Sequence, residues 1–176
     1  MCTRFYARKC DIVEVDRAVG KEFLKENHLM GNGRGDYLGL EHEGNLVTVL
    51  QFRRKNGQEY EISRFCHKLE HTVVGGYTRL INEAVRKFSP TKLITFVDLR
   101  YGSGEYLNDL GFTLETCYPS FCWVNVSSLE CFARMQFPGN SGYDAKLYKL
   151  WDCGQAKYVK CITQSSQLTE LEQKPT

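Results

Sequence analysis

The sequence lacks any apolar run long enough to cross a membrane. A spanning helix needs roughly 18 to 20 consecutive apolar residues, and no stretch of the 176 residues comes near that length. The opening MCTRFYARKCDIVEVDR also lacks the apolar core of a secretion signal. We therefore expect no membrane association and an intracellular location.

Proline is scarce, and neither sign of charge is in large excess. The 4 prolines, 42% hydrophobic residues and 25% charged residues do not favour collagen-like, coiled-coil or disordered architectures. The 23 basic and 21 acidic residues leave a net charge of +2, too small to demand a nucleic-acid partner. We expect one folded domain over residues 1–163 and a flexible polar tail over residues 164–176.

Cysteine, by contrast, is plentiful, with 8 residues at wide and irregular spacings. Without an export signal, this pattern favours reduced thiols over a disulfide framework. Cys66, His67 and His71 lie close together, but no second pair with zinc-ligand spacing accompanies them. We therefore expect no metal site.

The first third of the chain predicts a strand, a helix, a glycine loop and a hairpin. Alternating apolar residues indicate a strand over 11–16, and an apolar face indicates a helix over 18–28. Three glycines in the run 31–36 predict a mobile loop beside a groove. Apolar residues on both sides of Glu43-Gly44-Asn45 then predict two antiparallel strands over 37–54.

The middle of the chain predicts strand, helix, strand and short helix. Residues 60–65 read as a strand, 71–76 as a loop, 92–99 as a strand buried on both faces and 105–110 as a short helix. The helix that follows the loop has apolar residues at intervals of three and four, which give it one buried stripe: Tyr77, Leu80, Ile81, Ala84, Val85 and Phe88.

The last part of the chain has weaker patterns. We predict a strand over 120–126, a helix over 127–135 and a strand pair over 147–160 that turns at Asp152-Cys153-Gly154. The whole succession of elements indicates an α/β (α+β) protein.

The join between Val73-Val74-Gly75-Gly76 and the helix after it has two interpretations. Glycines let backbone amides approach an anion closely, and a helix N-terminus carries partial positive charge, so the join is a candidate phosphate site. Paired glycines at a helix start also serve simply as turn residues. Both interpretations stay open at this point.

The segment LITFVDLRYGSGEYLNDLGF, residues 93–112, resembles the strand, turn and "LGF" ending of the Gcn5-related N-acetyltransferases, the GNAT superfamily. The resemblance implies a mixed, mostly antiparallel sheet flanked by helices, with acetyl-CoA bound where the fourth strand splays from the fifth. At Tyr77 the sequence departs from the family's glycine pattern. The implied cofactor-binding residues are Ser63, Phe65, Val73, Val74, Gly75, Gly76, Tyr77 and Thr78.

A second resemblance covers nearly the whole chain. The motifs ENHLMG, ISRFCHKL, VVGGYTRL and KLWDCGQAKYV look like a phage domain that occurs alone or beside homing endonucleases, with a layout similar to the phage DNA-modification protein Mom. This resemblance implies the cytoplasm of a host cell and DNA as partner. It favours transfer of an acyl-derived group to a nucleobase amine, with a non-catalytic DNA-binding module or an inhibitor of a host protein as alternatives.

Several polar residues are candidates for catalysis. Asp98 and Arg100 end a buried strand, where α/β sheets often bind ligands, although they are equally suited to pair with each other. Tyr106 is placed by the family resemblance to protonate a leaving thiolate. Arg64 lies within a strand, and we expect it in a groove facing Asp98. His28 is either a base or a helix cap.

Basic and aromatic residues suggest a surface for DNA. Clustered cations contact phosphates, and aromatic rings stack on bases, although most exposed cations on proteins are simply solvated. The phage resemblance favours the DNA interpretation. The expected contacts are Arg53, Arg54, Lys55, Arg79, Arg100 and Tyr101.

Overall fold

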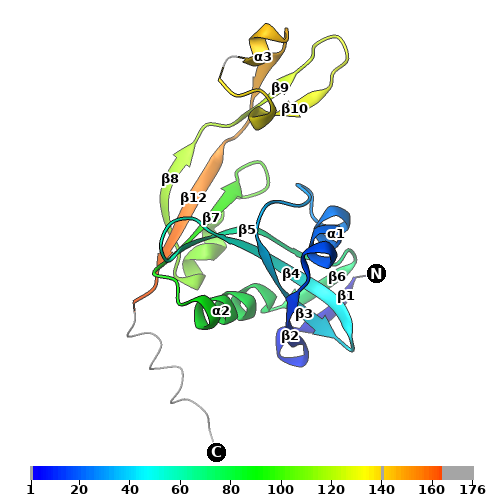
Figure 1. Ribbon diagram of the computed structural model, residues 1–176, viewed down its shortest axis with the longest axis vertical. Helices are drawn as coiled ribbons and strands as arrows, with labels where there is room; N and C mark the ends of the chain where they lie inside the picture. The colour runs from blue at the N-terminus through cyan, green and yellow to red at the C-terminus, as the bar shows by residue number, and fades with distance from the viewer. Residues whose placement is uncertain (1, 140, 164–176) are drawn as a thin grey trace, which may run out of the picture. The chain divides into compact units, whose positions relative to one another are not determined.

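The computed structural model describes residues 2–139 and 141–163, apart from the side chains of residues 133 and 135 (Figure 1). The chain divides into two compact units, one of residues up to Thr95 together with those from Val159, the other of Phe96–Tyr158. The expected single domain over 1–163 stays a prediction, and the expected tail over 164–176 lies outside the described residues.

The first unit is built on a sheet in which four neighbouring strands are antiparallel. β2 (Asp11–Val15), β3 (Asp36–His42), β4 (Asn45–Arg54) and β5 (Glu59–His67) are hydrogen-bonded in that order. The next strand, β7 (Lys92–Asp98), runs parallel to β5. The sheet is therefore mixed and mostly antiparallel, as the sequence predicts.

Two helices cover opposite faces of this sheet. α1 (Arg17–Asn27) begins at Asp16, whose side chain accepts the Ala18 N–H at 2.8 Å, and it packs Phe23 and Leu24 against Tyr37 and Val49. α2 (Gly76–Phe88) buries Leu80, Ile81 and Ala84 of the predicted stripe and leaves its other three residues partly buried. The Phe88 ring contacts Phe52 at 4.7 Å between centroids. Val49 and Phe52 are three residues apart on β4, so their side chains point to opposite faces of the sheet. The two helices that they contact therefore lie on different faces.

β1 (Thr3–Tyr6) pairs in parallel with β6 (His71–Val74), and a 3-10 turn, η1 (Ala7–Lys9), follows β1. The predicted loop over 71–76 is therefore wrong for its first four residues, which form a strand. The cause is the pairing with Thr3–Tyr6, a partner far away in the sequence that no local pattern reveals.

The second unit contains η2 (Glu105–Leu110), β8 (Thr113–Tyr118) and part of β12 (Gln155–Cys161), with β12 hydrogen-bonded between β7 and β8. Leu107 and Phe112 are almost fully buried there. The predicted short helix is present as a 3-10 helix, with glycines in the left-handed conformation at both caps.

A small three-stranded sheet lies between β8 and β12 in the chain. Trp123 on its middle strand is fully buried and meets the Tyr143 ring edge-on, with 4.9 Å between centroids. Its elements are β9 (Phe121–Val124), β10 (Cys131–Ala133), η3 (Arg134–Gln136), α3 (Ser141–Asp144) and β11 (Tyr148–Trp151), in strand order β10-β9-β11.

The predicted helix over 127–135 is wrong. The Asn125 side chain accepts the N–H groups of Ser127 at 2.9 Å and Ser128 at 3.2 Å, which makes a turn, and the chain reverses to pair β10 with β9. Asparagine competes with helix formation through this local hydrogen bonding.

Candidate functional site

β5 extends beyond its parallel pairing with β7. The register joins Glu59–Ile62 to Lys92–Thr95, whereas β5 continues for five more residues, Ser63–His67, paired with β4 on its other side. In the described chain, no strand is in register with that second edge of Ser63–His67. A strand edge of this kind presents N–H and C=O groups to an extended ligand.

A bulge in β5 sets where its side chains point. Gln51 on β4 lies opposite Arg64, and its neighbour Phe52 lies opposite Ile62, so Ser63 is the extra residue. The Ser63 hydroxyl donates to Gln51 Oε1 at 3.1 Å. Bulges redirect the side chains that follow them. As a result Arg64 lies on the α1 face of the sheet, and Phe65 lies on the α2 face.

Phe65 comes together with the start of α2. Its ring meets the Tyr77 ring edge-on, with 4.8 Å between centroids. Gly75 caps the helix in the left-handed conformation with φ of 76°, no side chain caps the first turn, and that turn holds no acidic residue. Uncapped N–H groups at a helix start favour an anion. The structure thus brings Phe65 of β5 together with Tyr77 of α2, two of the predicted cofactor residues.

The glycine loop over 31–36 is fastened to β4 by hydrogen bonds. Gly33 N–H donates to the buried Gln51 side chain at 3.2 Å, and Gln51 Nε2 donates to Asn32 Oδ1 at 3.1 Å and to the Tyr37 hydroxyl at 3.0 Å. A Cβ atom on Gly35 would overlap the Phe52 carbonyl oxygen. Glycine is therefore needed for the close approach of the loop to the sheet.

Two predicted catalytic residues, Arg64 and His28, meet the glycine loop. Arg64 Nε donates to the Gly31 carbonyl at 3.2 Å, and Arg64 forms no ion pair with any carboxylate in the described part of the chain. Burial lowers the pKa of the Arg64 guanidinium. His28 is the C-cap residue of α1, and its Nδ1 accepts the Met30 N–H at 3.0 Å. Burial, followed by the charge of Arg64, lowers the pKa of His28.

Asp98 and Arg100 pair with each other. Arg100 Nε lies 2.9 Å from Asp98 Oδ1, and Nη2 lies 2.5 Å from Oδ2. The guanidinium holds the pKa of Asp98 below its ordinary value, and the carboxylate raises the pKa of Arg100. A carboxylate with a lowered pKa is a weaker proton acceptor. Asp98 and Arg64 belong to different units, so their expected approach stays a prediction.

Tyr106, the predicted acid, lies on η2 with 62% of its surface exposed. Desolvation of its hydroxyl, and next the neighbouring Tyr158, raise the pKa of Tyr106. Tyr158 itself donates to the Ser103 carbonyl at 2.8 Å. The Tyr106 phenol is therefore protonated at neutral pH, as any tyrosine with a pKa of about 10 or above is, and the raised pKa makes it a weaker acid.

Several cations expected to contact DNA are engaged within the protein. The Glu61 carboxylate forms ion pairs with Arg53 at 3.0 Å and with Lys55 at 3.1 Å. Arg54 donates to the Gly57 carbonyl, and Arg79 donates to the Ala7 carbonyl. Arg100 is paired with Asp98, so all five of the expected cations have partners within the protein. Tyr101 is 66% exposed and lies beside the Arg100 guanidinium at 5.5 Å.

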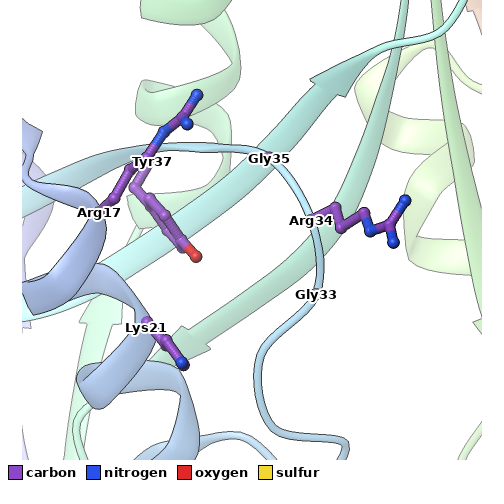
Figure 2. Close-up of a pocket in the computed structure, with 6 residues that line it drawn as sticks. All are labelled: Arg17, Lys21, Gly33, Arg34, Gly35 and Tyr37. Carbon is purple, nitrogen blue, oxygen red and sulfur yellow. The ribbon is translucent and has the colours of Figure 1, made fainter.

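The structure contains a basic hollow that the sequence analysis did not predict. Its volume is about 440 Å³, and it lies between α1 and the glycine loop (Figure 2). The sequence signal that could have revealed it is the i,i+4 spacing of Arg17 and Lys21, which puts both on one helix face beside the loop. The lining residues are Arg17, Lys21, Gly33, Arg34, Gly35 and Tyr37.

The cysteines do not form disulfides, since all eight are free thiols. Within residues 2–139 and 141–163, no group of three histidine, cysteine or acidic side chains is placed to hold a metal ion. None of the helices in these residues is long and apolar enough to span a bilayer.

Comparison with known proteins gives structural matches but no sequence match. No family model and no curated protein matches the chain. The structure is similar to the ribosomal-protein-S18-alanine N-acetyltransferase of Escherichia coli, with a TM-score of 0.57 and 11% identity over 88% of this chain and 95% of that one.

Two other acetyltransferases show the same likeness. The spermidine/spermine N-acetyltransferase of Vibrio cholerae matches with a TM-score of 0.57 and 14% identity over 94% of this chain and 99% of the other. A GNAT family acetyltransferase of Elizabethkingia anophelis with acetyl-CoA bound matches with a TM-score of 0.53 and 8% identity over 88% and 99%. The chain therefore has the GNAT acetyltransferase fold, and the predicted fold class is confirmed.

Proposed function

We propose that the protein is an acyltransferase that takes its acyl group from acetyl-CoA. The observation that carries this proposal is the edge of β5 over Ser63–His67, which continues past the pairing with β7 and ends near the uncapped start of α2. The strand edge suits the amide groups of the pantetheine arm, and the α2 start suits the pyrophosphate. The acetyl-CoA bound to the Elizabethkingia neighbour supports this assignment.

The chemistry requires a proton donor for the leaving group. An amine nitrogen bonds to the thioester carbonyl carbon, the carbon–sulfur bond breaks, and the thiolate takes a proton. In this proposal Tyr106 gives that proton, in the role that the family resemblance implies, since a phenol is protonated at neutral pH. The amine must lose a proton in turn. His28, whose lowered pKa leaves it neutral, suits that task better than Asp98, because Arg100 lowers the pKa of Asp98 and makes it a weaker base.

The acceptor in this proposal is a nucleobase amine of DNA. The support is the phage resemblance in the sequence, together with Arg64, a half-buried cation that makes no ion pair with the described carboxylates and lies under the glycine loop. A cation in that setting suits a phosphate beside the reacting base.

Thr78→Asp tests the donor half of the proposal. Thr78 is exposed in the first turn of α2. A carboxylate there interacts favourably with the helix dipole but repels a bound pyrophosphate. We expect acetyl-CoA to raise the melting temperature of the wild type and not of this variant. A ligand at about 100 times its dissociation constant adds about 2.7 kcal/mol to the stability.

Asn82→Asp is the matched control, since Asn82 is exposed on the same helix one turn later. It should keep the full thermal shift. The acceptor half is tested by mass spectrometry of nucleosides from cells that express the protein. A modified base that is absent with Tyr106→Phe is the expected result. An unmodified set of bases with the wild type would count against DNA as the acceptor.

A non-catalytic DNA-binding module is the second candidate. Two predicted site residues contact other side chains of the protein, which favours this candidate. Asp98 is paired with Arg100, and Tyr77 packs on Phe65. In that case acetyl-CoA leaves the melting temperature unchanged, whereas DNA binding is retained and weakens steeply with salt.

A further inference from the structure

β11 (Tyr148–Trp151) is an edge strand of the small sheet, since the strand order there is β10-β9-β11. In the described part of the chain, no strand is in register with its outer edge. Its large hydrophobic side chains are well exposed, with Tyr148 at 62%, Leu150 at 57% and Trp151 at 59%. A strand edge with exposed hydrophobic side chains is a template for pairing with another strand.

The hydrogen bonds of the small sheet fix which backbone groups of β11 point outward. The Asp152 N–H donates to the Ser120 carbonyl at 3.0 Å, one step beyond the end of the register between β9 and β11. In an antiparallel ladder every second residue bonds to a given neighbouring strand. The even-numbered residues of β11 therefore bond to β9, whereas the N–H and C=O groups of Lys149 and Trp151 point to the free edge.

Lys149, the charged residue of β11, does not shield this edge. Its ammonium lies over the ring of Phe121 at 4.9 Å, that of Tyr143 at 5.1 Å and that of Trp123 at 5.3 Å. Cation–π attraction holds it over one face of the small sheet. A charged side chain on an edge normally opposes pairing, but here the charge is held over the sheet and away from the edge.

The edge strands of the seven-stranded sheet differ from β11 in their charge. They are β2 and β8. β2 carries Asp11 and Glu14, and β8 carries Glu115. Carboxylates on an edge oppose pairing with a second copy of the same strand, because like charges then meet. β11 carries no carboxylate, which leaves it open to self-pairing.

We propose that β11 pairs antiparallel with β11 of a second copy of the chain, with Leu150 facing Leu150 of the second copy. In this register Lys149 lies opposite Trp151 of the second copy, so the outward N–H and C=O groups of both residues find partners on both copies. Lys149 also lies across from an aromatic ring, which attracts its ammonium. The interface has the two-fold symmetry of most homodimers.

The neighbouring registers satisfy fewer groups. If Lys149 faced Lys149 of the second copy, two ammonium groups would meet, and Trp151 would lie opposite Leu147, whose N–H is already bonded within its own chain. If Trp151 faced Trp151 of the second copy, the apolar Leu150 would lie opposite the carboxylate of Asp152. Charge and hydrogen bonding therefore both favour the register centred on Leu150.

The proposed pairing buries side chains on both faces of the small sheet. Tyr148 and Leu150 lie on one face of β11, and Trp151 lies on the other. The paired strands are short, so the interface does not exceed the roughly 1,000 Å² that a stable complex buries. We therefore expect a weak, reversible dimer. The proposal concerns self-association alone and does not depend on acyl transfer.

Sedimentation velocity of the full chain in reducing buffer tests the proposal, over about 1 to 200 µM to suit a weak interface. The mean mass of the wild type should rise from monomer toward dimer. Leu150→Asp and Leu150→Lys should each weaken the dimer at least about tenfold, because like charges face each other at the two-fold axis. An equimolar mixture of the two variants should dimerise more than either alone, because opposite charges then meet.

Leu114→Asp is the matched control, since Leu114 is 52% exposed on the edge strand β8. It should dimerise as the wild type does. Tryptophan fluorescence of the wild type is a second readout, which does not depend on how the variants fold. Trp123 is already fully buried, so a shift of the emission to shorter wavelength with rising concentration reports burial of Trp151.

The proposal is overturned if the wild type stays monomeric over this range, which would leave β11 to an extended segment of another protein. It is also overturned if Leu150→Asp dimerises as the wild type does, if the mixture dimerises no more than its components, or if Leu114→Asp is equally impaired. Because no acetyl-CoA is present, these outcomes are separate from a failure of the proposed acyltransferase.

Discussion

The Glu61 carboxylate on β5 holds two cations although the residue is only 7% exposed. Its two partners, Arg53 and Lys55, look from the sequence like a basic surface for DNA. Arg53 is partly buried, and its Nε has no partner among the described residues. The net charge of this cluster therefore depends on Glu61, which no sequence pattern singles out as the partner of Arg53 and Lys55.

Glu61→Gln should destabilise the protein by about 1.5 to 3 kcal/mol, the usual range for a hydrogen bond to a charged group that is removed at a buried position. Urea denaturation measures the change. Glu22→Gln, which removes the exposed pair with Lys25, is the control and should cost less than about 0.5 kcal/mol. Equal midpoints for the two variants would contradict the role given to Glu61.

Cys66 should resist alkylation in the folded protein. Burial raises the pKa of its thiol to about 12, so little of the reactive thiolate exists at neutral pH. Iodoacetamide should modify the exposed Cys2 and Cys153 first. Peptide mass spectrometry reads the order, and in urea all eight cysteines should react. Labelling of Cys66 as fast as Cys2 under native conditions would contradict this.

Gly20 illustrates how packing between elements reverses a local preference. In an isolated helix, replacing glycine by alanine stabilises by about 1 kcal/mol. Here α1 lies so close to β3 that the new methyl group would meet the Tyr37 ring at 2.6 Å. The helix must then move away from the sheet, or the ring must leave its position.

Gly20→Ala should therefore lower the stability, because overpacking costs about 1 to 3 kcal/mol and exceeds the gain in helix propensity. Thermal denaturation measures the difference. Glu26→Ala, at an exposed position of the same helix, should be close to neutral. A higher melting temperature for Gly20→Ala would mean that α1 is not seated on Tyr37 as described.

Elements that depend on local patterns were predictable from the sequence. The hairpin turn is an example, since Glu43 and Gly44 have positive φ values of 51° and 75°. The buried stripe of α2 is another. The sequence does not predict β1 and β8, and its predictions for β6 and β10 are wrong, because the pairing partners of these strands are not revealed by local patterns. The predicted pairing of the two strands over 147–160 is also wrong, since β11 pairs with β9 and β12 lies between β7 and β8.

The candidate site follows the same division. Residue types alone are enough to single out Arg64, His28 and Asp98 as candidates. Their partners were predictable only for Asp98 and Arg100, two residues apart in the sequence. The contact between Arg79 and Ala7 spans 72 residues, and nothing in the neighbourhood of Arg79 reveals that its guanidinium is already engaged.

For the whole molecule, the shifted groups together define a pH window of stability. Burial lowers the pKa values of His28 and His67 below their ordinary 6.5, so the folded state resists taking up protons there. Stability should therefore fall as the pH drops below about 6.5. Asp98, with its pKa lowered by Arg100, adds a further loss at more acidic pH.

At alkaline pH the Cys66 thiol makes the stability fall as the pH rises. The pKa of Cys66 rises from 9.0 to about 12 in the folded state, so stability should fall as the pH rises above about 9. Melting temperatures across this range should be highest between about 6.5 and 9. His28→Gln should move the acid limb to lower pH. A flat profile from about pH 5 to 9 would contradict these assignments.

The parallel pairing of β1 with β6 has a consequence for how the protein is made. Thr3–Tyr6 is synthesised well before its partner His71–Val74. With β1 still waiting, most of β2 to β5 can form, since these strands pair with near neighbours. The pairing of β1 with β6 is therefore a late event of vectorial folding, and slow translation after residue 74 should leave β1 open to capture by a chaperone.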